Sequence, residues 1–193
     1  MRMISRTVLC SFALASLLFG SVAAHAQRPA QGPISRDVIQ PEKLGYRLVW
    51  EDEFNGTKLD TTKWRHRGLG ARALAFVSEE ALEVKDGYVY LWAKKDASGR
   101  MLGSAIGTQQ TFMSRYGYYE CRAQVQKSWG QWGAFWLQSN QISAGEDPAI
   151  YGAEIDVMEC FRKLGPDIVS HNVHWAYGPN QKRTRGMQST IKG

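Results

Sequence analysis

The stretch Glu154-Ile155-Asp156-Val157-Met158-Glu159 sets three carboxylates among apolar and β-branched residues, as a β-strand with one acidic face would. Strand side chains alternate between two faces, so Glu154 and Asp156 share a face while Glu159 would fall on the other. A β-bulge around Val157 and Met158 adds one residue and returns Glu159 to the first face. We therefore predict a bulged strand that carries three crowded carboxylates on one face.

Short apolar or alternating runs surround this strand and are separated by turn residues. They predict strands at residues 46–50, 82–84, 88–93, 117–125, 134–138, 153–160 and 170–175. The dipeptides Asn55-Gly56, Asp86-Gly87 and Ser98-Gly99 are typical of hairpins and strand corners. No segment has a helical period of useful length. The spacing predicts an all-β sandwich. The basic, polar segment 178–193 is expected to be a loop that leads toward a further strand, so that the chain ends before the fold closes.

The first 26 residues have the pattern of a secretory signal peptide. A basic start with Arg2 and Arg6 precedes an apolar run, and the segment ends in the small residues around Ala26. Cleavage before Gln27 would send the mature protein to the periplasm or outside the cell. A membrane span is the alternative, but the apolar run is short and no stop-transfer charges follow it. Residues 27–44 contain three prolines and are expected to form a flexible leader.

Charge and cysteine content limit the partners. The formal charge of +6 falls to +4 when Arg2 and Arg6 leave with the signal peptide. This excess is small and scattered, so no nucleic-acid partner is expected, and we expect a monomer. Cys121 and Cys160 would remain in an oxidising compartment. They form either one disulfide, if their strands are neighbours, or two buried free thiols.

A second informative stretch is Trp129-Gly130-Gln131-Trp132-Gly133-Ala134-Phe135-Trp136, with three tryptophans in eight residues. Glycines let the backbone approach a ligand closely, and flat aromatic faces suit the apolar faces of sugar rings. Trp132, in the glycine-flanked turn, is expected to be exposed to a ligand. Trp136 lies in an apolar run and is either a second ligand-binding ring or part of the core.

The three carboxylates suggest a chemistry. Two carboxylates that flank a bond are the usual means of cleaving a glycoside, one as acid and one as nucleophile or base. Crowded like charges raise at least one pKa, so one carboxyl can stay protonated while its neighbour is ionised. This predicts Glu154 as nucleophile, Asp156 as its hydrogen-bonding partner and Glu159 as proton donor to the leaving oxygen. The alternative is an edge strand whose inward charges prevent aggregation.

The sequence resembles glycoside hydrolase family 16, the laminarinase, lichenase and agarase group, over about Tyr46 to Trp175. The motifs that carry the resemblance are Leu48-Val49-Trp50-Glu51-Asp52-Glu53-Phe54-Asn55-Gly56, Leu59-Asp60, Lys63-Trp64, Tyr116-Gly117-Tyr118-Tyr119-Glu120-Cys121-Arg122-Ala123, the tryptophan stretch, the acidic strand and His171-Asn172-Val173-His174-Trp175. The resemblance implies a concanavalin A-like β-jelly-roll sandwich of two curved antiparallel sheets. Residues 45–193 would be the N-terminal part of its catalytic domain.

The resemblance also implies roles for particular residues. Glu154 would be the nucleophile, Asp156 its assistant and Glu159 the acid/base, while His174 and Trp175 would line the cleft from an adjacent strand. His174 has a second interpretation as a hydrogen-bonded histidine within the sheet. The family often binds a structural calcium, which the resemblance would place on backbone oxygens of Glu53 and Gly87. The alternative for these two is an ordinary strand start and an Asp-Gly turn.

The predicted function is a secreted, retaining endo-glycosidase that hydrolyses a β-linked polysaccharide by double displacement and needs no cofactor for the chemistry. The sequence does not distinguish between β-1,3-glucan, mixed-linkage glucan and algal galactan as the substrate. Basic side chains either contact sulfate on an algal galactan or form a solvated face; they are Arg65, His66, Arg67, Arg72, Lys182, Arg183 and Arg185. The alternative function is a non-catalytic, lectin-like jelly-roll, although sugar binding alone does not need three crowded carboxylates.

Overall fold

The computed structural model describes residues 2–5, 39–126, 128–177 and 182–191. These residues are nearly all-β, which confirms the predicted fold class. Helical turns are short among them; they are η1 (Pro41–Leu44), η2 (Glu79–Ala81), α1 (Pro148–Tyr151) and η3 (Arg162–Leu164). The chain divides into two compact units. One contains Asp52–Met113 and the described residues of Cys121–Gly193, and the other contains the described residues of Arg2–Glu51 together with Ser114–Glu120.

The smaller unit is a three-stranded antiparallel sheet in the order β11-β1-β2. Its strands are β1 (Arg2–Ser5), β2 (Arg47–Glu51) and β11 (Tyr118–Glu120). The central strand therefore comes from the first residues of the predicted signal peptide. Residues 6–38, which hold the rest of that peptide and most of the predicted leader, lie outside the described residues. Pro41–Leu44 form η1, so regular structure begins within the segment that the sequence assigned to the leader.

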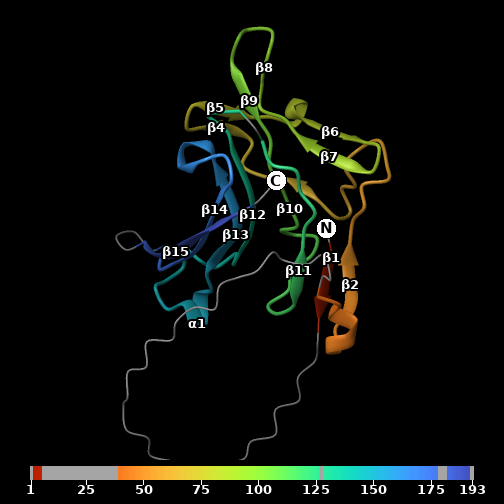
Figure 1. Ribbon diagram of the computed structural model, residues 1–193, viewed down its shortest axis with the longest axis vertical. Coiled ribbons are helices and arrows are strands. Elements are labelled where there is room, and N and C mark those ends of the chain that lie inside the picture. The colour runs from red at the N-terminus through yellow and green to blue at the C-terminus, as the bar shows by residue number, and fades with distance from the viewer. Residues whose placement is uncertain (1, 6–38, 127, 178–181, 192–193) are drawn as a thin grey trace, which may run out of the picture. The chain divides into compact units, whose positions relative to one another are not determined.

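The larger unit contains a four-stranded antiparallel sheet that carries the acidic stretch (Figure 1). Its strands, in order across the sheet, are β12 (Trp132–Gln138), β13 (Glu154–Phe161), β14 (Ile168–Trp175) and β15 (Arg183–Thr190). The first three match predicted strands to within two residues. The prediction of a loop at 178–193 is wrong for β15, which pairs with β14 along its whole length. Most of its residues are exposed, so β15 lacks the apolar alternation by which strands are recognised.

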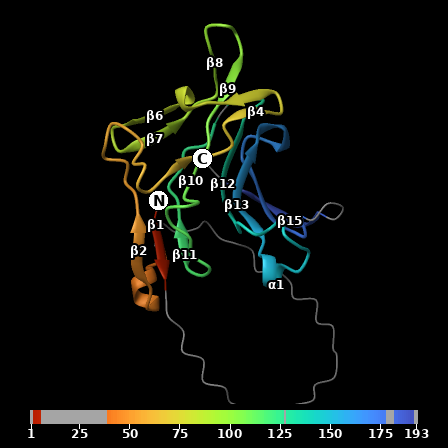
Figure 2. The same ribbon diagram turned by 180° about the vertical axis from the view of Figure 1, so that it is seen from behind.

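Three smaller sheets complete the larger unit, and Figure 2 shows them from behind. Their strands are β4 (Gly70–Arg72), β5 (Ala75–Val77), β9 (Met101–Gly103) and β8 (Lys94–Lys95) in one sheet, β3 (Arg65–His66) with β10 (Ile106–Gly107), and β6 (Leu82–Lys85) with β7 (Tyr88–Leu91). Most have two or three residues, too few for a periodic pattern. The β5–β9 pair is parallel, and the other pairs in these sheets are antiparallel.

Turn chemistry agrees with the sequence at two hairpins. Asp86 and Gly87 join β6 to β7 with φ angles of +54° and +75°, the pair of positive values that a type I′ turn requires. Gly99, between β8 and β9, has a φ of +85°. The dipeptides Asp86-Gly87 and Ser98-Gly99 therefore lie where the sequence predicts turns.

The apolar core of the larger unit supports the site sheet. Its buried side chains include Val77 of β5, Leu102 of β9, Cys160 of β13 and Val169 of β14. Cys160 directly follows Glu159, and Val169 directly precedes Ser170, the residue paired with Glu159. Alternation therefore places Cys160 and Val169 on the opposite, core-facing side of the sheet. Cys121 and Cys160 are both free, which rules out the predicted disulfide. Cys160 is buried, as the alternative of two buried free thiols predicts, but Cys121 is exposed, so that part of the prediction is wrong. Burial raises the pKa of the Cys160 thiol.

Among the described residues, no helix has the length and apolar character needed to cross a bilayer.

Candidate active site

The bulge predicted in β13 is present. Phe135 pairs with Met158 and Trp136 pairs with Asp156, which leaves Val157 as the extra residue. The register with β14 shifts at the same place, between Asp156 and Glu159. The side chains of Glu154, Asp156 and Glu159 consequently lie on one face of the sheet, the carboxylate face. Without the bulge, strict alternation would turn Glu159 into the core.

The register of the four strands arranges the carboxylate face in three rows. Each row holds one residue of β12, β13, β14 and β15, and each contains one of the acids. The rows are Gln138, Glu154, His174 and Thr184; then Trp136, Asp156, Asn172 and Gly186; then Ala134, Glu159, Ser170 and Gln188. Pairing of neighbouring strands therefore brings side chains from residues 134 to 188 beside the acids.

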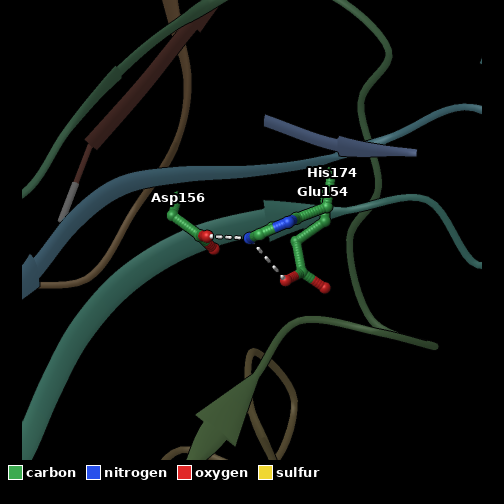
Figure 3. Close-up of side chains that lie close together, drawn as sticks. All are labelled: Glu154, Asp156 and His174. Atoms are coloured by element: carbon green, nitrogen blue, oxygen red, sulfur yellow. Dashed lines mark hydrogen bonds and ion pairs between the residues drawn. The ribbon is translucent and has the colours of Figure 1, made fainter. Parts of the chain in front are cut away.

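His174 links two of the acids (Figure 3). Its Nε2 lies 2.8 Å from Asp156 Oδ2 and 4.0 Å from Glu154 Oε1. Its Nδ1 lies 2.6 Å from Thr184 Oγ1. The ring is thus fixed from both sides, and its hydrogen bond to Asp156 explains how two carboxylates can stay close together.

Asp156 is the most deeply buried of the three acids, with 4% of its surface exposed. Burial raises its pKa above the ordinary value for an aspartate, and the negative charges of Glu159 and Glu154 raise it further. The interactions with His174 oppose this rise. Burial and the neighbouring carboxylates therefore favour the protonated form of Asp156.

Glu154 accepts hydrogen bonds from two residues that the sequence did not single out. Gln138 Nε2 donates to Glu154 Oε2, and the Tyr177 hydroxyl also donates to Glu154. Burial and the negative charge of Glu154 raise the pKa of the Tyr177 phenol well above its usual range, so this group stays protonated. Both partners present N–H or O–H groups to Glu154, as suits an ionised carboxylate.

Arg67 fixes the orientation of Gln138. Its Nη2 donates to Gln138 Oε1 at 2.6 Å, which leaves Nε2 of the amide to face Glu154. The Arg67 guanidinium also lies 4.6 Å from the centre of the Trp136 ring. Arg67 precedes Gln138 by 71 residues, so only the folded structure brings it to this site.

Both oxygens of Glu159 are occupied by donors. Trp132 Nε1 donates to Oε1 at 2.9 Å, and Asn172 Nδ2 donates to Oε2 at 2.6 Å. Glu159 is buried, with 6% of its surface exposed. An indole and an amide therefore hold its carboxyl group in a defined plane.

The structure places the other predicted residues as follows. Trp132 is 59% exposed, in agreement with its expected accessibility, and Trp136 lies on the carboxylate face beneath Arg67. Trp175 follows His174 directly in β14 with no register shift, so alternation directs it to the opposite face. The prediction that Trp175 lines the site beside His174 therefore does not agree with this register.

The residues predicted to hold calcium come together. A Cβ at Gly87 would lie 3.8 Å from the Glu53 carbonyl oxygen and 3.9 Å from Asn55 Oδ1. Carbonyl and amide oxygens are suitable calcium ligands, but the ion takes six to eight oxygens, more than these groups supply. At the carboxylate face, ligand atoms of Glu154, Asp156 and His174 lie within 4.8 Å of one another, close enough for a cation. The direct contact of His174 with Asp156 already occupies two of these atoms.

Three partners of the acids, Asn172, Gln138 and Tyr177, were not predicted from the sequence. A local sequence pattern could have identified Asn172 alone. Asn172 precedes His174 by two positions, so period-two alternation places both on the same face. Gln138 depends on the pairing of β12 with β13. Tyr177 follows Ala176, which has a φ of +57° and ends the extended run. No local pattern announces either Gln138 or Tyr177.

The chain is similar to several known proteins. The family model described as glycosyl hydrolases family 16 matches residues 71–191. Glucan endo-1,3-beta-glucosidase A1 of Niallia circulans is 30% identical over 158 residues, which are 70% of this chain and 23% of that protein. Beta-porphyranase D of Zobellia galactanivorans is 29% identical over 154 residues, which are 72% of this chain and 34% of that protein.

A solved structure also matches. The laminarinase from Flavobacterium sp. UMI-01 superposes with a TM-score of 0.60 at 26% identity, covering 75% of this chain and 64% of that one. The fold is therefore the jelly-roll of these enzymes. The chain spans between about a quarter and a third of the length of the two curated relatives.

Proposed function

The chain belongs to glycosyl hydrolases family 16, and from this membership we propose that it is a retaining endo-glycosidase that hydrolyses a β-linked polysaccharide by double displacement. The observation that carries the proposal is the bulged strand β13, which brings Glu154, Asp156 and Glu159 to one face. The names of the matched proteins supply the substrate class, since they act on a β-1,3-glucan, on laminarin or on porphyran.

In the first step, Glu154 attacks the anomeric carbon from the α-face. The C1–O bond to the leaving sugar breaks as the Glu154–C1 bond forms, and Glu159 gives its proton to the departing oxygen. The donors Gln138 and Tyr177 hold Glu154 in place for this attack. Trp132 contacts Glu159 and is exposed, so its ring is available to stack on the sugar beside the broken bond.

In the second step, water enters from the side that the leaving sugar has vacated. Glu159, now ionised, takes a proton from the water as its oxygen attacks C1, and the bond to Glu154 breaks. Two inversions restore the β-configuration. Asp156 assists Glu154: its hydrogen bond with His174, together with burial that raises its pKa, allows a proton to be shared near the nucleophile without a third full charge.

Three further features belong to the proposal. We infer that the protein is secreted through the signal peptide at residues 1–26, whose cleavage would remove β1 from the smaller unit. It acts as a monomer. The chemistry needs no cofactor. A structural calcium would take the backbone oxygens of Glu53 and Gly87 together with further oxygen ligands, and its effect would be on stability and not on the reaction.

A substrate screen with product analysis tests the function. We expect the protein to release reducing ends from at least one of laminarin, mixed-linkage glucan, agarose, porphyran and carrageenan. Proton NMR of the first products should show the β-anomer before mutarotation. An initial α-anomer would contradict double displacement. Binding to one of the polysaccharides without any turnover would favour the lectin-like alternative. Cleavage of porphyran or carrageenan alone would indicate that the arginines contact sulfate.

The contact between Gln138 and Glu154 yields a second prediction. The variant Gln138→Ala removes one donor to a charged group, an interaction worth roughly 1.5–3 kcal/mol, so kcat should fall about 10- to 100-fold. KM should change little, because the side chain of Gln138 contacts Glu154 and Arg67, and the proposed mechanism gives it no contact with the substrate. Gln141→Ala is a matched control, because Gln141 is an exposed glutamine outside the strands of the site sheet. Equal kcat values for the two variants would rule out a role for Gln138.

A further inference from the structure

Gly186 of β15 lies directly opposite Asn172 of β14, and Asn172 in turn contacts Glu159 of β13. We propose that Gly186 and Asn172 form a positioning pair that orients the Glu159 carboxyl for proton transfer. The proposal rests on the proposed function, in which Glu159 is the acid/base. It assigns a role to a residue two strands away from the reacting group.

The amide of Asn172 has one orientation that satisfies its neighbours. Its Nδ2 donates to Glu159 Oε2 at 2.6 Å and to Ser170 Oγ at 3.2 Å, so both amide hydrogens have acceptors. The amide oxygen Oδ1 then points toward β15, where it lies over Gly186. The close approach of Oδ1 to β15 is therefore a consequence of the bond to Glu159.

A side chain at position 186 would occupy the space that Oδ1 needs. A Cβ built on Gly186 would overlap Asn172 Oδ1 and would lie 2.9 Å from the His171 carbonyl oxygen. Asn172 would have to rotate away, and its Nδ2 would leave Glu159. Glycine weakens the interior of a strand and often marks a place where another group approaches closely. The contact with Asn172 gives such a reason for glycine in β15.

Asn172 and His174 follow one geometric rule. Asn172 is paired with Asp156, yet its side chain reaches diagonally to Glu159; His174 is paired with Glu154 and reaches diagonally to Asp156. Diagonal neighbours on paired strands lie within reach of such side chains. Because His174 already binds Asp156, Asn172 has Glu159 as its remaining acidic partner. The two side chains of β14 therefore act on different acids.

Asn172 and Trp132 differ as supports for Glu159. Trp132 is 59% exposed at the first residue of β12, where a bound sugar would contact it. Asn172 lies in the middle of β14, between two paired strands. We infer that Asn172 holds Glu159 in the same orientation with and without substrate. Such preorganisation matters most for a group that must donate and later accept a proton along one direction.

The test compares substrates that differ in their need for an acid. Breakdown of the polysaccharide requires protonation of a poor leaving group, whereas an aryl β-glycoside of the released oligosaccharide, with an acidic phenol, leaves without it. For Asn172→Ala we expect kcat/KM on the polysaccharide to fall about 30-fold, and on the aryl glycoside by less than about 3-fold. Gly186→Ala should likewise lower kcat/KM on the polysaccharide much more than on the aryl glycoside. The double variant should have the same kcat/KM values as Asn172→Ala alone, because both changes remove the same contact between Asn172 and Glu159.

Gly103→Ala is the matched control, since Gly103 also lies in a strand and a Cβ there would meet nothing within 4 Å. Thermal melting verifies that each variant folds. If Gly186→Ala does not fold, Asn172→Ala carries the test alone, because the double variant keeps the approach of the new Cβ to the His171 carbonyl oxygen. Equal losses on both substrates, or losses that add in the double variant, would overturn the positioning pair. Glu159→Ala serves as the reference variant. If it loses equal activity on both substrates, the proposed function is wrong. If Glu159→Ala alone loses more activity on the polysaccharide than on the aryl glycoside, only the positioning pair is refuted.

Discussion

Replacement of Glu154 by alanine should lower kcat on the polysaccharide by at least about four orders of magnitude, which corresponds to roughly 5.4 kcal/mol of lost transition-state stabilisation. In the proposed mechanism Glu154 forms the covalent bond of the first step, and no neighbouring group can replace it. Asp156 is buried and held by His174, so it does not reach the same position. Binding of the polysaccharide should persist, because Trp132 and Trp136 are unchanged.

The stereochemistry of rescue by azide tests whether Glu154 is the nucleophile. The shortened side chain leaves room for azide, which would attack C1 from the α-face that Glu154 normally occupies. With an activated aryl β-glycoside, Glu154→Ala should therefore yield the α-glycosyl azide, identified by NMR. Glu80→Ala, at an exposed residue of η2, is the matched control and should keep wild-type turnover. Wild-type turnover by Glu154→Ala would remove Glu154 from the mechanism.

The second large effect is expected for Glu159→Ala. Loss of a general acid and base costs about 10²- to 10⁴-fold, and the loss should appear in kcat/KM for the polysaccharide. With an activated aryl β-glycoside, the first step should proceed at nearly its normal rate, because the phenol departs without a proton. The second step then becomes limiting, since water has no base. A burst of phenol equal to the enzyme concentration should precede slow turnover.

Azide distinguishes this variant from the first. Azide needs no general base and would enter from the β-face, where water attacks the glycosyl-enzyme in the proposed mechanism, so Glu159→Ala should yield the β-glycosyl azide. The two variants thus give products of opposite anomeric configuration. If Glu159→Ala gave the α-product, the roles of Glu154 and Glu159 would be exchanged. The absence of rescue together with equal losses on both substrates would mean that Glu159 takes no part in proton transfer.

The structure explains why three carboxylates can be crowded on β13. Each acid has its own partner from another segment: Gln138 and Tyr177 for Glu154, His174 for Asp156, and Trp132 and Asn172 for Glu159. Donors reduce the cost of burying charged groups. An edge strand with inward charges was the structural alternative to a catalytic site. It does not describe β13, which is paired on both sides by β12 and β14.

The sequence by itself determined the local features of this protein. The spacing of Glu154, Asp156 and Glu159, together with strand alternation, required a bulge, and the bulge is present. The Asp86-Gly87 turn and the strands of the site sheet up to β14 were likewise readable, because each depends on neighbours a few positions apart. Trp132 was correctly placed in an exposed position for the same reason.

Only the tertiary structure decided which groups surround the acids. Arg67 reaches Gln138 across 71 residues, and Asn172 lies against Gly186 in a strand that the sequence presented as a loop. Trp175 shows the converse, since its position beside His174 in the sequence directs it to the other face. The physical reason is that strand pairing and register, which local patterns do not encode, determine the neighbours of a side chain across a sheet. The sequence thus determined the acids and the bulge, and the fold supplied the partners that hold each acid for its role.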